Sequence, residues 1–293
     1  MILIVASSMI CGAEERVNHG IADWISFAAN LEASRHDTQF FEPHHDANVG
    51  SWDSRLEIWL PPYREAGAYG PYIRFSGIKA NKPDAWENVF LAAPGCGFQI
   101  FPFSFKSLKG EDQSFRFLGP LRLYGEYNRQ DYWGEENSWR PRFQKKAGAD
   151  YWLDWHGNDY RYSWWAEIWG GIWWQSANEY DGHYNTSFGA LNVRTGLRVP
   201  SAERLSWFTP YLVMDSTSSS KHTSYWENRF QLGGGLRIVP DLAKKEAALT
   251  RCFIFVENIR TCSYYHTQGP SSIPRTDHRF GIGATIGSWF YQP

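Results

Sequence analysis

The 293-residue sequence lacks a charge excess of either sign. Its 29 Lys and Arg residues nearly balance 31 Asp and Glu residues, and the two signs are interspersed along the chain. Nucleic-acid-binding proteins carry a basic patch, so we expect no nucleic-acid partner. Outside its extreme N-terminus the chain also lacks any run of 18 apolar residues, which excludes a helical membrane protein. It has neither a glycine period nor a heptad repeat, which excludes collagen and a coiled coil.

Cysteine is scarce, with four residues in the chain. Cys252 and Cys262 lie ten residues apart on one expected strand, about 33 Å at about 3.3 Å per residue. A disulfide needs Cα atoms within about 7 Å, so these two cannot bridge, and nothing in the sequence supports a bridge from Cys96. The four show no CxxC or Cys/His spacing. We expect free cysteines that pack as small residues, no metal site and no cofactor.

Aromatic residues, in contrast, are abundant. The chain has 16 Trp, 16 Tyr and 19 Phe, together 17% of the residues, although its mean hydropathy is −0.49. Disordered chains are poor in aromatic residues, so disorder is excluded. Two classes remain: a soluble all-β protein, or a β-barrel that keeps its polar residues in a lumen.

The N-terminal residues 1–13 contain an apolar stretch that ends in small residues before two glutamates. This pattern predicts a secretory signal peptide cleaved after Ala13, followed by a single domain over 14–293. The missing basic residues before the apolar stretch leave two alternatives open. They are a lipid anchor on Cys11 and a buried N-terminal strand.

Apolar and polar residues alternate with a period of two along most of the chain. Leu191 and Val193, for example, alternate with Asn192 and Arg194, which is typical of strands with one polar and one apolar face. A helix is considered only at 241–249. We expect twelve antiparallel strands, at roughly 22–33, 52–60, 69–77, 87–101, 120–130, 143–155, 163–177, 187–199, 206–215, 225–239, 250–264 and 278–290.

The expected connections also alternate in length. An even number of strands with long connections at one end and short ones at the other is typical of bacterial outer-membrane barrels. The connection at 102–119 is an exception to the alternation. The longer ones are 34–51, 78–86, 131–142, 178–186, 216–224 and 265–277, and the tighter ones are 61–68, 156–162, 200–205 and 240–249.

The sequence repeats itself at a nearly constant offset. The tripeptide Trp-Glu-Asn occurs at 86–88 and again at 226–228, an offset of 140. Such internal similarity predicts a duplication of six strands into twelve, although alternating β sequences also resemble one another by composition. Further matches pair Pro71-Tyr72-Ile73 with Pro210-Tyr211-Leu212 at 139, and Glu126 with Glu257 at 131.

Placing the polar parity inside the barrel gives a lumen of mixed charge. Buried charges persist only when they are paired or hydrated, so the sequence is compatible with a salt-bridged plug and with a conducting pore. Asp53 shares this parity, whereas Arg129 and Arg260 break it and indicate either a bulge or a position at the rim. The predicted lumen-lining residues are Arg55, Glu57, Arg74, Glu87, Arg122, Glu126, Lys146, Asp150, Glu167, Arg194, Arg198, Glu227, Arg229, Arg237, Arg251, Glu257 and Arg279.

Trp and Tyr gather at the ends of the expected strands, as they do at the two interfaces of a membrane. In a soluble β protein the same aromatic pairs would form a core or a sugar-binding surface. The predicted interface aromatics are Tyr132, Trp133, Trp164, Trp173, Trp174, Tyr264, Tyr265, Trp289, Phe290 and Tyr291.

The terminal segment RFGIGATIGSWFYQP resembles the C-terminal strand of bacterial outer-membrane proteins, except that Gln292 and Pro293 follow its last aromatic residue. The Trp/Tyr-rich strands resemble the C-terminal barrels of exopolysaccharide exporters and phage adsorption proteins. This resemblance implies a protein of the bacterial outer membrane, reached by the secretory pathway. It also implies a passive conduit for glycan or small polar solutes, in which inward arginines attract acidic groups and Trp or Tyr rings stack on sugars.

Two other functions compete with a channel or export component. A non-conducting scaffold or adsorption site would bind a periplasmic or surface protein through its long connections, especially 34–51. An outer-membrane lipid hydrolase would need a nucleophile, a base and an orienting group, which Ser187, His183 and Asp181 offer by type. His183 and Ser187 would be too far apart on an extended strand, so we expect no enzyme. His44-His45-Asp46 could bind a metal, but a loop is favoured there because adjacent strand residues point to opposite faces.

Overall fold

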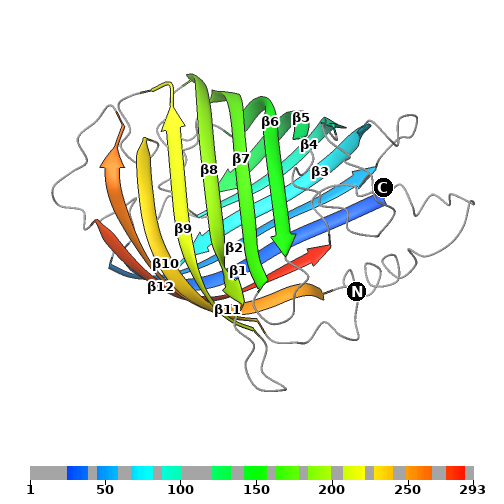
Figure 1. Ribbon diagram of the computed structural model, residues 1–293. Coiled ribbons are helices and arrows are strands. Elements are labelled where there is room, and N and C mark those ends of the chain that lie inside the picture. The colour runs from blue at the N-terminus through cyan, green and yellow to red at the C-terminus, as the bar shows by residue number, and fades with distance from the viewer. Residues whose placement is uncertain are drawn as a thin grey trace, which may run out of the picture.

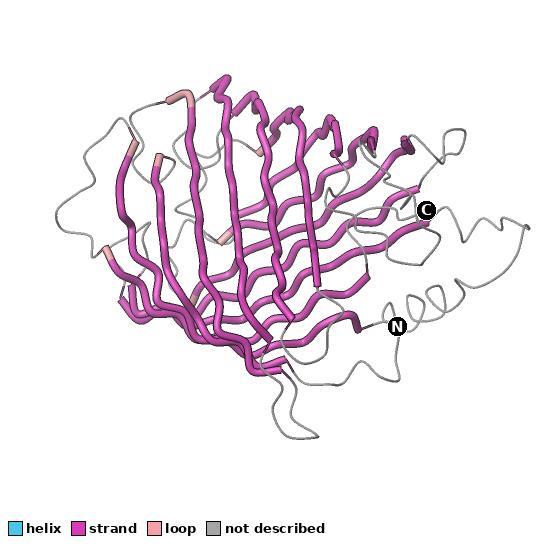
Figure 2. The backbone as a smooth tube through the Cα atoms, viewed as in Figure 1, coloured by secondary structure: helices cyan, strands magenta, loops and turns pink. Residues whose placement is uncertain are grey.

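The computed structural model describes twelve segments of the chain, and a strand accounts for nearly all of each one (Figures 1 and 2). The described residues are 25–38, 45–58, 67–81, 88–100, 121–132, 142–156, 163–177, 184–198, 207–221, 228–239, 249–265 and 275–287. The strands are β1 (Ile25–Thr38), β2 (His45–Ile58), β3 (Gly67–Ala80), β4 (Val89–Ile100), β5 (Leu121–Tyr132), β6 (Phe143–His156), β7 (Ser163–Ala177), β8 (Tyr184–Arg198), β9 (Trp207–Ser219), β10 (Arg229–Val239), β11 (Leu249–Tyr264) and β12 (Thr276–Gly287).

The sheet closes on itself. Each strand pairs antiparallel with its neighbours in sequence, and β12 pairs with β1 in a register that runs from Ala28 opposite Gly287 to His36 opposite Arg279. In Figure 1 the blue β1 lies beside the red β12. The predicted twelve-stranded antiparallel barrel is therefore confirmed, and no strand in it has an unpaired edge.

Some strands, among them β1, β2 and β3, extend further than the alternation alone predicted. β1 and β2 continue to Thr38 and from His45, so the connection between them is 39–44 rather than the predicted 34–51. At the opposite end, the connection between β2 and β3 is 59–66. The predicted sorting of long and short connections is therefore wrong. Polar stretches that resembled loops are strand ends, in which side chains such as Ser34 and His36 point into the barrel and Arg35 between them points outward.

The outward face of the barrel is apolar. Large apolar side chains with 37% to 68% of their surface exposed occur on every strand, and all of them share the outward parity. Exposed apolar patches of this extent are rare on soluble monomers. In lipid every backbone group must pair internally, which a closed barrel achieves. These side chains are Leu31, Leu56, Ile58, Phe75, Phe98, Leu123, Tyr127, Phe143, Trp164, Ile172, Trp174, Leu191, Leu197, Phe208, Leu212, Leu232, Leu236, Ile238, Ile254, Val256, Phe280 and Ile282.

Other predictions concern the cysteines and the chain outside the strands. Cys96, Cys252 and Cys262 are free thiols, and the first and last of them are exposed on the outward face rather than packed in a core. Within the described segments, no helix is long and apolar enough to cross a membrane. The predicted signal peptide at 1–13 and the alternative helix at 241–249 lie outside the described residues.

A charge in the middle of the outward face should be costly. Ile172 is 68% exposed near the middle of β7, and we expect Ile172→Arg to lower the free energy of unfolding in lipid vesicles by about 2–4 kcal/mol. Urea titration followed by tryptophan fluorescence measures this, with Ile172→Val as the control. If the arginine variant were as stable as the control, the outward face would not lie in lipid.

Candidate functional site in the lumen

Ion pairs between strands that are not neighbours identify the inside of the barrel. Arg194 on β8 contacts Glu257 on β11 at 3.2 Å, although strands β9 and β10 lie between them in the sheet. Arg237 on β10 likewise contacts Glu167 on β7 at 2.9 Å. Side chains can span two intervening strands only across the concave face, so this face is the lumen.

The strand register places the described members of the predicted lumen set on this inward face. For two of them, Arg198 and Arg251, the placement rests on the backbone register opposite Ser163 and Thr285. Glu87 and Glu227 lie outside the described residues. The members with described side chains are Arg55, Glu57, Arg74, Arg122, Glu126, Lys146, Asp150, Glu167, Arg194, Arg229, Arg237, Glu257 and Arg279.

Paired charges line the wall formed by β2 to β6. Arg74 donates two hydrogen bonds of 2.8 Å to the carboxylate of Asp53. Arg122 donates to both carboxylate oxygens of Asp150, from Nε to Oδ1 at 2.8 Å and from Nη2 to Oδ2. Such two-point pairs fix both side chains, so these four groups hold a defined arrangement on the lumen wall.

A buried tyrosine organises the same wall. The Tyr72 hydroxyl on β3 donates to Glu126 Oε1 on β5 at 2.8 Å, and the guanidinium carbons of Arg55 and Arg122 lie 5.1 and 5.3 Å from its ring centroid. Gly95 on the intervening β4 makes room for the ring, because a Cβ there would lie 2.7 Å from Tyr72 Cζ. One aromatic ring thus connects three strands and two cations.

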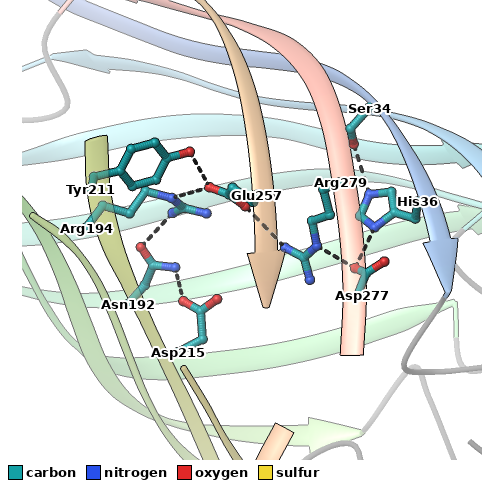
Figure 3. A network of polar contacts seen from close by, with 9 residues as sticks. All are labelled: Ser34, His36, Asn192, Arg194, Tyr211, Asp215, Glu257, Asp277 and Arg279. Atoms are coloured by element: carbon teal, nitrogen blue, oxygen red, sulfur yellow. Dashed lines mark hydrogen bonds and ion pairs between the residues drawn. The ribbon is translucent and has the colours of Figure 1, made fainter. Parts of the chain in front are cut away.

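A second network lies on the opposite wall, formed by β8 to β12 (Figure 3). Glu257 is its centre: it accepts a 2.8 Å hydrogen bond from the Tyr211 hydroxyl and a 3.2 Å bond from Arg194 Nε. Arg279 Nη1 lies 3.9 Å from its other oxygen. Arg194 also donates to Asn192 Oδ1 at 2.8 Å, which extends the network along β8.

The network continues across the closing seam of the barrel. Arg279 Nε donates to Asp277 Oδ2 at 2.6 Å, and His36 Nδ1 on β1 lies 3.1 Å from the same oxygen. Ser34 Oγ is 2.9 Å from His36 Nε2. The side chains of β11, β12 and β1 are therefore linked inside the lumen, as Figure 3 shows.

The two networks share a local geometry. Tyr211, Glu257 and Gly235 repeat the arrangement of Tyr72, Glu126 and Gly95: both hydroxyl to carboxylate distances are 2.8 Å, and a Cβ on either glycine would lie 2.7 Å from the tyrosine Cζ. Similarly, Asn88 and Asn228 each accept a backbone hydrogen bond, from Ala80 at 2.9 Å and from Ser219 at 3.0 Å. These matched contacts favour the internal duplication, which stays a prediction.

An aromatic row runs along the inward face of β7. Trp165, Trp169 and Trp173 follow one another at every fourth residue, and the ring centroids of the last two are 6.3 Å apart. Trp173 stacks on Phe188 of β8 at 5.4 Å, and Lys146 Nζ lies 4.6 Å from its centroid. The row places apolar ring surface between the two charged walls.

The predicted membrane-interface aromatics divide between the two faces. Trp164 and Trp174 lie outward and are 46% and 38% exposed. Trp173 faces the lumen instead, and Tyr132 does too, since its hydroxyl donates to the inward Gln130 at 2.7 Å. Alternation along single strands explains both corrections, because adjacent residues cannot share a face. Tyr264 pairs with the inward Arg229 in the strand register, and the Tyr265 hydroxyl lies 3.1 Å from the Ser216 hydroxyl. The remaining predicted interface aromatics lie outside the described residues: Trp133, Trp289, Phe290 and Tyr291.

Charged side chains at mid-height of the lumen are partly accessible to solvent. Asp53 and Arg74 lie near the middles of β2 and β3, and their side chains are 31% and 23% exposed although they face inward. Arg194 on β8 is 22% exposed and Glu167 on β7 is 20% exposed. Other charges are almost fully buried, including Arg122 and Glu57 at 2% and 3%.

The alternative chemical sites find little support. Ser187 lies on the outward face of β8, where its backbone N–H donates to Ser220 Oγ, and its proposed partners Asp181 and His183 lie outside the described residues. His45 pairs with Thr38 as part of a strand, not a loop. Within the described segments no group of three His, Cys, Asp or Glu residues could hold a metal ion.

Several lumen residues are absent from the predicted set. Tyr72 and Tyr211 share the parity of the predicted charges but are not in the set, because the set names charged residues only. His36 and Asp277 lie beyond the ends of the predicted strands 22–33 and 278–290, and Asp215 is the last residue of the predicted strand 206–215. Because these include acidic groups, the lumen is closer to electrical balance than the predicted set implied.

No family model matches the sequence, and no curated protein matches it. Among solved structures, the β domain of the Bordetella autotransporter Brka is 12% identical, with a TM-score of 0.40, over 91% of this chain and 100% of that one. An outer membrane channel from Pseudomonas putida F1 is 10% identical, with a TM-score of 0.42, over 94% and 98%. An outer membrane protein of Acinetobacter baumannii is 10% identical, with a TM-score of 0.33, over 90% and 98%.

The assignment of the chain rests on its own geometry. A closed antiparallel barrel with an even number of strands, an apolar exterior on every strand and a charged interior is the architecture of bacterial outer-membrane proteins. The chain is an outer-membrane β-barrel.

The glycines under the two tyrosine rings should be intolerant of a side chain. We expect Gly95→Ala and Gly235→Ala each to displace a ring from its glutamate and to lower the free energy of unfolding by about 1–3 kcal/mol, the usual effect of overpacking. Gly125→Ala is the matched control, since a Cβ there meets no atom within 4 Å. Urea titration in lipid vesicles measures all three. Equal stability of the three variants would contradict a tight fit of the rings.

Loss of the central glutamate of the second network should lower the free energy of unfolding more than loss of an exposed acidic residue. Glu257→Gln removes the charge that faces Arg194 and Arg279, and we expect a loss on the order of 3 kcal/mol, because unpaired buried charges are costly. Asp131→Asn breaks the pair between Asp131 and Arg129, whose side chains are 46% and 64% exposed, and should cost less than about 1 kcal/mol. The reverse order in urea titration would contradict the network.

Proposed function

We propose that the barrel is a channel for small polar solutes, with a lumen wall that binds glycans. The observation that carries this proposal is the water-exposed Asp53 and Arg74 pair halfway along the lumen. A fully packed plug would bury charged groups at this depth. Hydrated charges at mid-height support a continuous aqueous path.

The pairing of the lumen charges supports weak selectivity for the sign of an ion. Arg74, Arg122 and Arg194 each bind a carboxylate of the same wall, so their charges are largely compensated within the barrel. The resemblance to exporters implied that inward arginines attract acidic groups. The pairing favours a passing solute that is polar and neutral, as many glycans are.

The aromatic row on β7 supports a glycan as the bound solute. Sugars present apolar faces and hydroxyl edges, which suit ring surfaces beside hydrogen-bonding groups. Trp165 is buried against Tyr211, so the accessible part of the row runs from Trp169 to Trp173, about 13 Å at about 3.3 Å per residue. Trp169 is partly exposed to the lumen, and the charged residues of the neighbouring walls supply donors and acceptors.

Single-channel recording in planar bilayers tests the proposal. We expect ion conduction, with brief blockades when oligosaccharides are added. Trp169→Ala should shorten the blockades about tenfold, since one aromatic contact contributes about 0.5–1.5 kcal/mol. Trp174→Ala on the outward face of the same strand is the matched control and should leave them unchanged.

A non-conducting scaffold is the second candidate. It is favoured by the nearly complete burial of Arg122 and Glu57, which resemble the contents of a plug. A well-folded barrel that is silent in bilayers would overturn the channel and support the scaffold. Conduction without blockades by oligosaccharides would support the channel and contradict the binding of glycans in its lumen.

A further inference from the structure

Among the residues whose side chains the structure describes, the charges on the outward face are confined to one end of the barrel. They lie where the odd-numbered strands end and the even-numbered strands begin. At the opposite end, the described outward side chains are uncharged and include Ile58, Phe98, Leu197 and Ile238. The charged outward side chains that the structure describes are Arg35, Lys79, Arg129, Asp131, Lys145 and Arg260.

The sign of these charges is also uneven. Five are basic and are here called the basic rim: Arg35, Lys79, Arg129, Lys145 and Arg260, all exposed. The acidic Asp131 pairs with Arg129 at 3.3 Å, but both side chains are about half exposed, so this pair is weak. Among the outward side chains described at this end, basic groups therefore outnumber acidic ones, although the whole chain carries −2.

Two cations of the basic rim lie beside an exposed aromatic pair. On β5 and β6, Arg129 lies opposite Phe143 and Lys145 lies opposite Tyr127. Arg129 and Lys145 are therefore diagonal neighbours on the same face, about 7–8 Å apart. Their long side chains can both contact one anionic group. Tyr127 and Phe143 stack at 5.9 Å and are 48% and 54% exposed. A cationic head site thus adjoins an apolar surface.

We propose that the basic rim binds the phosphate-bearing headgroups of anionic lipids in the leaflet at that end of the barrel. Arg129 and Lys145 hold the phosphate, and the stacked Tyr127 and Phe143 contact the first part of an acyl chain. Lysine and arginine near a membrane surface each contribute about 1 kcal/mol toward anionic lipids. The proposal depends on the membrane location of the barrel and is independent of conduction through its lumen.

Native mass spectrometry of the detergent-solubilised full chain tests this inference. Lipid A, phosphatidylglycerol, phosphatidylcholine and inorganic phosphate serve as the probes. We expect both anionic lipids to be retained more strongly than phosphatidylcholine, and inorganic phosphate not to be retained. Preference between lipid A and phosphatidylglycerol then tells whether the headgroup carries one phosphate or two.

Substitution of the two cations localises the site. The double variant Arg129→Gln and Lys145→Gln should weaken retention of the anionic lipid about 30-fold, which corresponds to about 1 kcal/mol for each lost cation. Arg275→Gln is the matched control, because Arg275 is exposed at the same end but has the inward parity. Equal retention of phosphatidylcholine, or equal losses in the control, would overturn the proposal.

Discussion

Everything in this molecule depends on the pairing of β12 with β1. A strand edge left open in lipid would expose backbone N–H and C=O groups that have no water to bind. The closing register from Ala28 to His36 removes that edge. Closure also divides the side chains of every strand into two environments, because successive residues of a strand point to opposite faces. The apolar exterior and the charged lumen are two results of the same constraint.

The lumen then has to accommodate charge inside a narrow sheet. Charges taken from water are costly unless they are paired. In this barrel they are paired in two networks on opposite walls. Each is centred on a tyrosine that donates to a glutamate two strands away, at 2.8 Å. The pairing compensates most arginines, and the Asp53 and Arg74 pair at mid-height stays partly exposed. Buried and solvent-accessible ion pairs therefore coexist in one lumen.

Strand number and face were predictable from the sequence because they depend on alternation alone. The charges of the described wall, such as Arg55 and Glu257, took the parity that their strands predicted. Strand ends were less predictable, since polar inward residues such as His36 and Asp277 resemble loop residues by composition. Contacts across the lumen were not predictable, because the pairing of Arg194 with Glu257 depends on how the two intervening strands, β9 and β10, curve. Aromatic composition likewise could not tell the inward Trp173 from the outward Trp174.

The ion pairs that skip over strands have a mechanical consequence. Backbone hydrogen bonds fix how adjacent strands slide, but they leave the cross-section free to flatten or widen. Arg237 with Glu167, and Arg194 with Glu257, join strands three apart at 2.9 and 3.2 Å. They act as chords across an arc of the wall and resist a change in its curvature. The curvature of this arc of the wall is thereby stabilised from within the lumen.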